Sequence, residues 1–254
     1  MKNPNRLAIF LAGVGVVLAL GATVGCTEVS TSGPLFPDGG WIPDSGPITE
    51  EPRSVGSVTG LIHNGIGTVI ISQGGASQLR VRAPENLQSR LLAEMQGGNL
   101  VISFQPGPTV QSVGAIEFYL TVVDLSRLEL TGVGSIRGDN ISTGDMTVIR
   151  SGVGEIDLQG LNVNRLDVTK SGVGSVRLGG RAVRQTVSVD GLGDYEAAAL
   201  ATQEAYITLH GASSARVQVS DRLDAVIHSS GSVYYYGNPA ITRAGNGSGR
   251  VIQM

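Results

Sequence analysis

The stretch SGVGSVRL, residues 171–178, decides the fold because the chain repeats it. Most copies share a polar residue, two glycines separated by one apolar residue, and then alternating side chains. The position of Gly172 recurs at intervals of 18 to 20 residues, at 132, 152, 172, 191, 211, 229 and 247. A glycine-rich loop that cradles a phosphate is needed once in a nucleotide-binding protein. A unit repeated at this short period instead predicts a solenoid.

Alternating side chains on both sides of the glycines predict strands. The position four residues after each repeat point is apolar, and so is the position four residues before it, except at Arg243. Intervening positions are mostly small or polar, which gives each strand one inward and one outward face. The unit is too short for a propeller blade of about 40–45 residues. We therefore predict an all-β fold, a parallel β-helix or β-solenoid of about 18–20 residues per coil.

In such a coil the paired glycines have a structural role, since glycine lets the chain turn a corner through positive φ without a Cβ clash. The predicted corner glycines are Gly65, Gly67, Gly132, Gly134, Gly152, Gly154, Gly172, Gly174, Gly191 and Gly193.

One outward column supports this stacking register. The residues five positions after the repeat point alternate in charge, as Arg137, Asp157, Arg177, Glu196 and Arg216. Opposite charges on successive coils attract, whereas a column of one sign would repel. We interpret the column as structural rather than as a binding site.

Residues 1–25 are typical of a signal peptide. Lys2 and Arg6 precede an apolar run over residues 7–20, which is shorter than the roughly 20 residues that a membrane helix needs. We expect this segment to lie outside the fold.

The motif Thr23-Val24-Gly25-Cys26 resembles the lipobox of bacterial lipoproteins. The resemblance implies that Cys26 is lipidated and becomes the first residue after cleavage. Cys26 is the only cysteine of the chain and has no partner for a disulfide. Thr27 follows it rather than Asp, which in such signals points to the outer membrane. We expect a bacterial envelope protein held to the membrane through its lipid, periplasmic or surface-facing.

Residues 26–53 are rich in Pro, Gly and acidic side chains, a composition that predicts an extended tether. The whole chain has a formal net charge of −3 with dispersed arginines. Nucleic-acid binding needs a concentrated basic face, so we expect no nucleic-acid partner.

Residues 54–126 form a less regular lead-in before the regular repeats at 127–254, and we expect 54–254 to be one continuous domain. NGIGTVII at 64–71 matches the corner motif, and residues 78–84, 99–106 and 116–124 read as strands. Residues 84–95 fit either a short helix or a strand with a bend. We interpret the lead-in as a cap that covers the end of the solenoid.

These features together resemble a known bacterial family. A lipobox, a Pro-rich tether, the lead-in GIGTVIIS…LRVRAPENL…GGNLVISF and SGVGSVRL-type repeats are similar to the family called putative auto-transporter adhesin, head GIN domain. The resemblance covers about residues 55–254. It implies a β-solenoid at the cell surface or in the periplasm, and it brings no catalytic residues.

The strongest candidate metal site is a polar corner column. Asp190, His210 and His228 each stand one residue before a repeat point, so they should be neighbours on successive coils. Two histidines and a carboxylate are a ligand set for zinc or another transition metal. The other members are Ser, Thr and Asn, which favour capping of the corner backbone instead. Ser171 in this column does not complete a hydrolase triad, because Asp190 lies between it and His210.

The sequence contains one outward aromatic patch. Alternation places Tyr235 inward and leaves Tyr234 and Tyr236 outward as a candidate ligand patch. His63 has no evident partner and is predicted to be a surface or turn residue.

We expect a lipid-anchored, non-enzymatic envelope protein with an adhesion-like or structural role and without a cofactor. Carboxylates are dispersed, unlike those of polysaccharide-cleaving enzymes. The alternative is a β-helix protein that binds or cleaves polysaccharide. Polysaccharides and surface proteins are the candidate partners, and the terminal solenoid edge offers self-association by strand addition.

Overall fold

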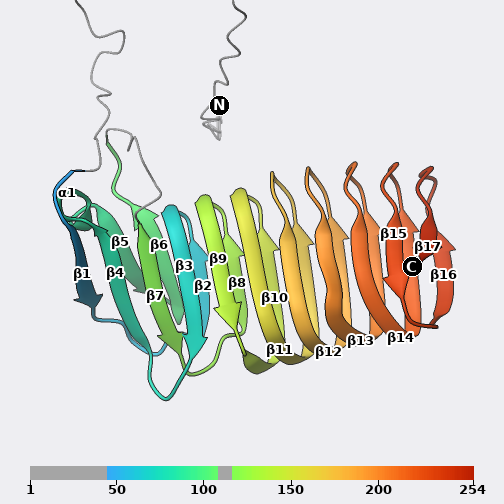
Figure 1. The fold of residues 1–254 in the computed structure, drawn as a ribbon, viewed down its shortest axis with the longest axis horizontal. Coiled ribbons are helices and arrows are strands. Elements are labelled where there is room, and N and C mark those ends of the chain that lie inside the picture. The colour runs from blue at the N-terminus through green and yellow to red at the C-terminus, as the bar shows by residue number, and fades with distance from the viewer. Residues whose placement is uncertain (1–44, 108–115) are drawn as a thin grey trace, which may run out of the picture. The chain divides into compact units, whose positions relative to one another are not determined.

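The computed structural model describes residues 45–107 and 116–254 (Figure 1). Its strands join a single 17-stranded sheet, and one helical turn accompanies them. The elements in chain order are β1 (Ile48–Arg53), β2 (Gly60–His63), β3 (Ile66–Gln73), β4 (Gln78–Pro84), α1 (Glu85–Gln88), β5 (Leu91–Gln96), β6 (Asn99–Phe104), β7 (Glu117–Val122), β8 (Arg127–Leu130), β9 (Val133–Asp139), β10 (Ser142–Arg150), β11 (Val153–Lys170), β12 (Val176–Val189), β13 (Tyr195–Leu209), β14 (Ala215–Ile227), β15 (Val233–Tyr236), β16 (Ala240–Ala244) and β17 (Val251–Gln253). Over these described ranges, no helix has the length and hydropathy needed to cross a membrane.

From β8 onward the strands pair in parallel, and each coil lies on the one before it (Figure 1). Ile156 pairs with Val176, and Val176 pairs with Tyr195, so the same repeat position stacks on successive coils. The predicted β-solenoid and its register are confirmed. The long strands β11 to β14 curve at the lower edge of the coils (Figure 1). Register shifts interrupt their pairing there, as between Leu158 and Leu161.

The lead-in stacks in an order that differs from chain order. β3 pairs with β9 on one side and with β7 on the other, and β2 likewise lies between β8 and β6. The coil that contains NGIGTVII is therefore inserted between two coils that follow it in the chain.

β1 pairs antiparallel with β4, β4 with β7, and β5 with β6. The predicted boundary at residue 53 is therefore wrong, because Ile48–Arg53 belongs to the sheet and not to the tether. β1 pairs with β4 on one side and carries Glu50, Glu51 and Pro52. Charged side chains and proline on an edge strand disfavour its pairing with a strand of another chain.

Residues 84–95 contain both of the structures that the sequence left open. α1 covers only Glu85–Gln88, and β5 begins at Leu91 and pairs antiparallel with β6. Proline is suited to the start of a helix because its missing N–H would be unpaired there, and Pro84 is the N-cap of α1. Buried Leu87 anchors the turn to the core.

The corner glycines stand where successive turns touch. Gly172 has φ +71° and Gly154 has φ +140°, conformations that L side chains rarely adopt. A Cβ atom on Gly154 would collide with the carbonyl oxygen of Gly134 on the preceding coil. The close stacking of the corners therefore requires glycine at this position.

The core is a set of apolar columns inside the coils. Ile136, Ile156 and Val176 are fully buried, as alternation predicted, and burial of such a side chain contributes about 1.5–3 kcal/mol. Arg243, the exception in its column, is exposed.

The prediction that His63 is a surface or turn residue is wrong. His63 lies in β2 with a fully buried side chain, and its ring meets the Phe118 ring edge-on at 5.9 Å. Its Nε2 lies 3.1 Å from the carbonyl oxygen of Gly67. Burial lowers the pKa of His63, so the ring is held neutral.

Candidate functional site

The corner column brings the two predicted histidines together. The rings of His210 and His228 are stacked, with centroids 5.1 Å apart and planes 8° from parallel. His228 Nδ1 lies 3.2 Å from Asn246 Oδ1. Asp190 Oδ1 instead accepts a 2.7 Å hydrogen bond from the Gly191 N–H, so it caps its own turn. Within residues 45–107 and 116–254, no three His, Cys, Asp or Glu side chains are grouped to hold a metal ion.

The three consecutive tyrosines alternate as predicted. Tyr235 is buried, whereas Tyr234 is half-buried and Tyr236 is exposed. The Arg216 guanidinium lies over the Tyr234 ring, 5.3 Å from its centroid. Tyr236 pairs in register with Gln218 of the preceding coil. The two outward rings therefore face different surroundings, one charged and one rich in amides.

The column of alternating charge is stacked as predicted. Asp157 pairs in register with Arg177, and Glu196 with Arg216. Arg216 forms ion pairs with Glu196 and, at 3.5 Å, with Asp194, while Arg177 pairs at 3.0 Å with Glu155 instead of its register partner. Because these groups are exposed or partly exposed, each pair contributes about 0–1 kcal/mol.

Two cations lie inside the solenoid, a feature that the sequence reasoning did not identify. Arg150 and Lys170 are fully buried and pair in register on successive coils. Arg150 donates from Nη1 to the carbonyl oxygen of Gly152 (3.1 Å) and from Nη2 to that of Gly174 (2.7 Å). Lys170 Nζ donates to the carbonyl oxygen of Leu192 at 3.1 Å. The cations thus satisfy carbonyl groups of the glycine corners from the inside.

Burial has a clear electrostatic effect on this pair. Desolvation lowers the pKa of Lys170 to about 8, and the neighbouring Arg150 charge adds to the effect, while Asp194 and Asp190 oppose it. The sequence did carry a signal. The position two residues before the repeat point reads Leu130, Arg150, Lys170, Val189, Leu209 and Ile227, so two cations interrupt an apolar column.

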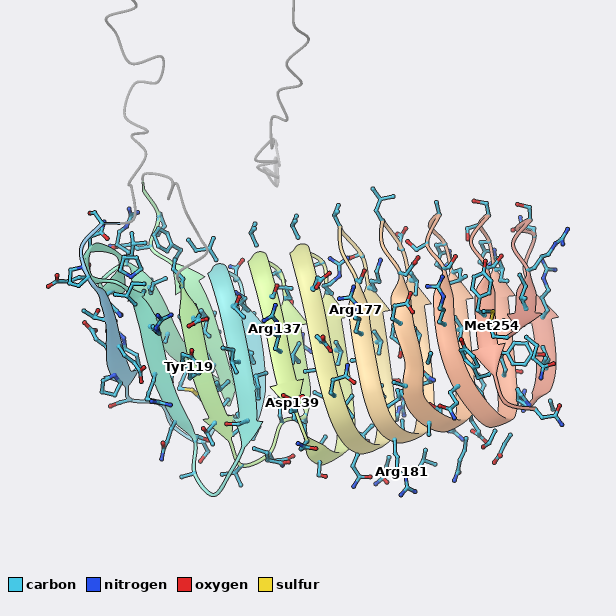
Figure 2. The ribbon with its side chains drawn as sticks, in the orientation of Figure 1. Tyr119, Arg137, Asp139, Arg177, Arg181 and Met254 are labelled. Carbon is cyan, nitrogen blue, oxygen red and sulfur yellow. The ribbon has the colours of Figure 1, made fainter. Side chains whose placement is uncertain are left out.

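A shallow groove runs across the bends of β11 to β14, and we call it the amide groove. It encloses about 490 Å³, and Asn162, Asn164, Gln203, Gln218 and Asn238 line it together with Arg181. Figure 2 shows Arg181 at the lower edge of the coils, far from the turns at the top. Two outward rows of side chains form the sides of the groove. A buried column lies between them and consists of Val163, Ala182, Thr202 and Val219. The first outward row consists of Asn162, Arg181, Ala201 and Gln218, paired coil by coil, and Tyr236 continues it.

The polar groups of the amide groove are available to a ligand. In the described part of the chain, the side chains of Asn164, Arg181, Gln203, Gln218 and Asn238 form no hydrogen bond or ion pair. Most surface arginines of these coils differ in this respect, as Arg184 shows in its 2.6 Å pair with Glu204. No carboxylate is among the described residues that line the groove. Glu204, in the adjoining hollow, is held by Arg184.

A second outward row is apolar. Val133, Val153, Val173 and Leu192 stand between the corner glycines of successive coils and are 47% to 59% exposed. We call this row the corner ridge. Cys26, the predicted lipid attachment site, lies outside the described residues.

The fold and its outward rows define a parallel β-solenoid with an irregular lead-in. Residues 59–239 match the family described as "Putative auto-transporter adhesin, head GIN domain", and the chain belongs to this family. The family expected from the sequence is confirmed.

Solved structures share the fold. A protein of Bacteroides fragilis NCTC 9343, described as a putative adhesin, is 23% identical with a TM-score of 0.81, covering 84% of this chain and 100% of its own. A Parabacteroides distasonis ATCC 8503 protein, described as a putative lipid binding protein, is 19% identical with a TM-score of 0.68, covering 84% and 99%. A putative adhesin of Parabacteroides merdae ATCC 43184 is 18% identical with a TM-score of 0.62, covering 85% and 99%. No curated protein matches the chain.

Proposed function

We propose that this chain is a non-enzymatic protein of the bacterial cell envelope, anchored through a lipid on Cys26, which holds surface partners in an adhesion-like role. The observation that carries the proposal is the repetition of outward side chains in register. The corner ridge presents an apolar side chain on each of four successive coils. The amide groove presents amide side chains on several coils, with Arg181 and Ala201 between Asn162 and Gln218 in its first row. Such rows match an extended or repetitive partner better than a single small substrate.

Two further observations support the proposal. The family description names an adhesin, and the lipobox-like motif ending at Cys26 supplies an anchor, with Thr27 after it favouring the outer membrane. The tether ends before β1, because Ile48–Arg53 is a paired strand of the sheet. The Pro- and Gly-rich residues between Cys26 and β1 can hold the solenoid away from the membrane because their composition favours extended chain.

The experiment is to express the full chain in a bacterium and to compare it with Cys26→Ser and with cells lacking the gene. We expect a fatty-acid label on the wild-type protein and none on Cys26→Ser. Cells that carry the wild type should adhere to surfaces coated with polysaccharide or matrix protein, and Cys26→Ser cells should adhere no more than the control cells. An unlabelled wild type would refute the anchor, and adherence equal to that of the control cells would refute the adhesive role.

A further inference from the structure

We propose that the amide groove is a binding site for a neutral glycan chain that lies along the solenoid axis. This inference rests on the proposed function and names the class of partner that the solenoid holds.

The chemistry of the lining favours hydroxyl groups. An Asn or Gln side chain both donates and accepts hydrogen bonds, and so does a sugar hydroxyl. The unpaired amides of Asn164, Gln203, Gln218 and Asn238 can each bond a hydroxyl in either direction. An apolar ligand would leave these groups without partners, at a cost for each.

The groove has too few positive charges to hold a polyanion. Arg181 is the single charged residue among the described lining residues. A nucleic acid or another polyanion is held by many cations whose binding releases counterions. The groove therefore fits a neutral chain, with Arg181 as a donor of several hydrogen bonds.

The strands under the groove have no unpaired edge to which an extended peptide could add. Peptides that add to a sheet need an unpaired strand edge. Here β12 and β13 are hydrogen-bonded on both sides, to β11 and β14 as well as to each other. Recognition must therefore come from side chains.

The length of the groove fits a chain of several sugar rings. The row from Asn162 through Arg181 and Ala201 to Gln218 advances by about 4.8 Å per coil. A volume of about 490 Å³ is in the range of ligand sites. At the end of the row, beside the lining residue Gly237, Tyr236 is 38% exposed, and an exposed aromatic side chain can stack on a sugar ring. Binding without cleavage is consistent with the lining, since glycoside hydrolysis uses a pair of carboxylates.

The test uses the full chain purified in detergent in calorimetric titrations. The ligands are neutral oligosaccharides of four to six residues, from gluco-, manno-, xylo- and galacto-series, and acidic oligosaccharides of the same length. The groove variant is Gln203→Ala/Gln218→Ala. The matched control is Gln78→Ala/Gln96→Ala, which removes two exposed glutamines from β4 and β5, away from the groove. Both variants should keep the wild-type melting temperature because the four side chains are exposed.

We expect at least one series to bind the wild type and the control equally, and the groove variant about tenfold or more weakly. Equal binding by the groove variant would overturn the site. Binding of acidic oligosaccharides alone would overturn the neutral class. If cells that carry the chain adhere while no oligosaccharide binds, the glycan groove is wrong and the proposed function stands. If the cells do not adhere either, both fail.

Discussion

Arg150 and Lys170 occupy the same position on neighbouring coils, and both cationic groups donate hydrogen bonds to carbonyl oxygens of the glycine corners. Two like charges are thus stacked inside the core without an ion-paired carboxylate among the described residues. The carbonyl dipoles compensate part of the desolvation cost, and Arg150 Nε has no partner within the described ranges.

The first prediction concerns the pH dependence of stability. The pKa of Lys170 is about 8 in the folded chain and about 10.5 for an ordinary lysine. Between these values the unfolded state binds more protons, so the free energy of unfolding rises with pH over this window, by about 1–3 kcal/mol. Lys170→Met should lack this rise. Denaturant unfolding at pH 7.5, 9 and 10.5 measures the difference, and parallel profiles would refute the buried charge.

Lys170 can also be titrated directly. It is the only lysine in the part of the chain that the structure describes, and the full sequence adds only Lys2. The NMR signal of its side chain should titrate near pH 8. A midpoint near 10.5 would show that the amine is exposed to water.

The second prediction concerns the corners. Gly154→Ala places a Cβ against the Gly134 carbonyl oxygen and strains a residue with φ +140°. We expect a loss of about 3 kcal/mol or more in unfolding free energy. Gly144→Ala is the matched control, because a Cβ there meets nothing within 4 Å, and its effect should stay within about 0.5 kcal/mol. Thermal or denaturant unfolding of the two variants compares them, and similar losses would contradict the assigned stacking.

The third prediction concerns the charged column. Glu196→Gln and Arg216→Gln, combined in a double-mutant cycle, should give a coupling energy of about 0.2–1 kcal/mol at low salt. The coupling should weaken in 1 M salt because the pair is partly exposed. A coupling near zero in both conditions would show that this column contributes register without stability.

Much of the solenoid could be predicted because its hydrogen-bonded stacking imposes a constant period. Corner glycines and inward columns such as Ile136, Ile156 and Val176 therefore repeat visibly in the chain. His63 was predicted wrongly because its coil is inserted between coils that follow it in sequence. Its neighbours, Ile102 and Leu130, come from β6 and β8 and cannot be found by counting along the chain.

The amide groove could not be predicted for a related reason. It lies at the bends of β11 to β14, where register shifts break the period counted from the glycine corners. Arg181 and Ala201 are 20 residues apart, but Ala201 and Gln218 only 17. Side chains that share a row therefore do not share a repeat position. Only Tyr236, at the end of the row, was identified from the sequence.

The central claim is that the solenoid surface binds partners without chemical turnover. The most direct measurement applies the purified full chain to arrays of immobilised polysaccharides and matrix proteins, with and without calcium and zinc, and records both retention and released products. We predict retention on at least one polysaccharide, no released product, and the same retention without added metal. Release of cleaved product, or no retention on any surface, would contradict the account.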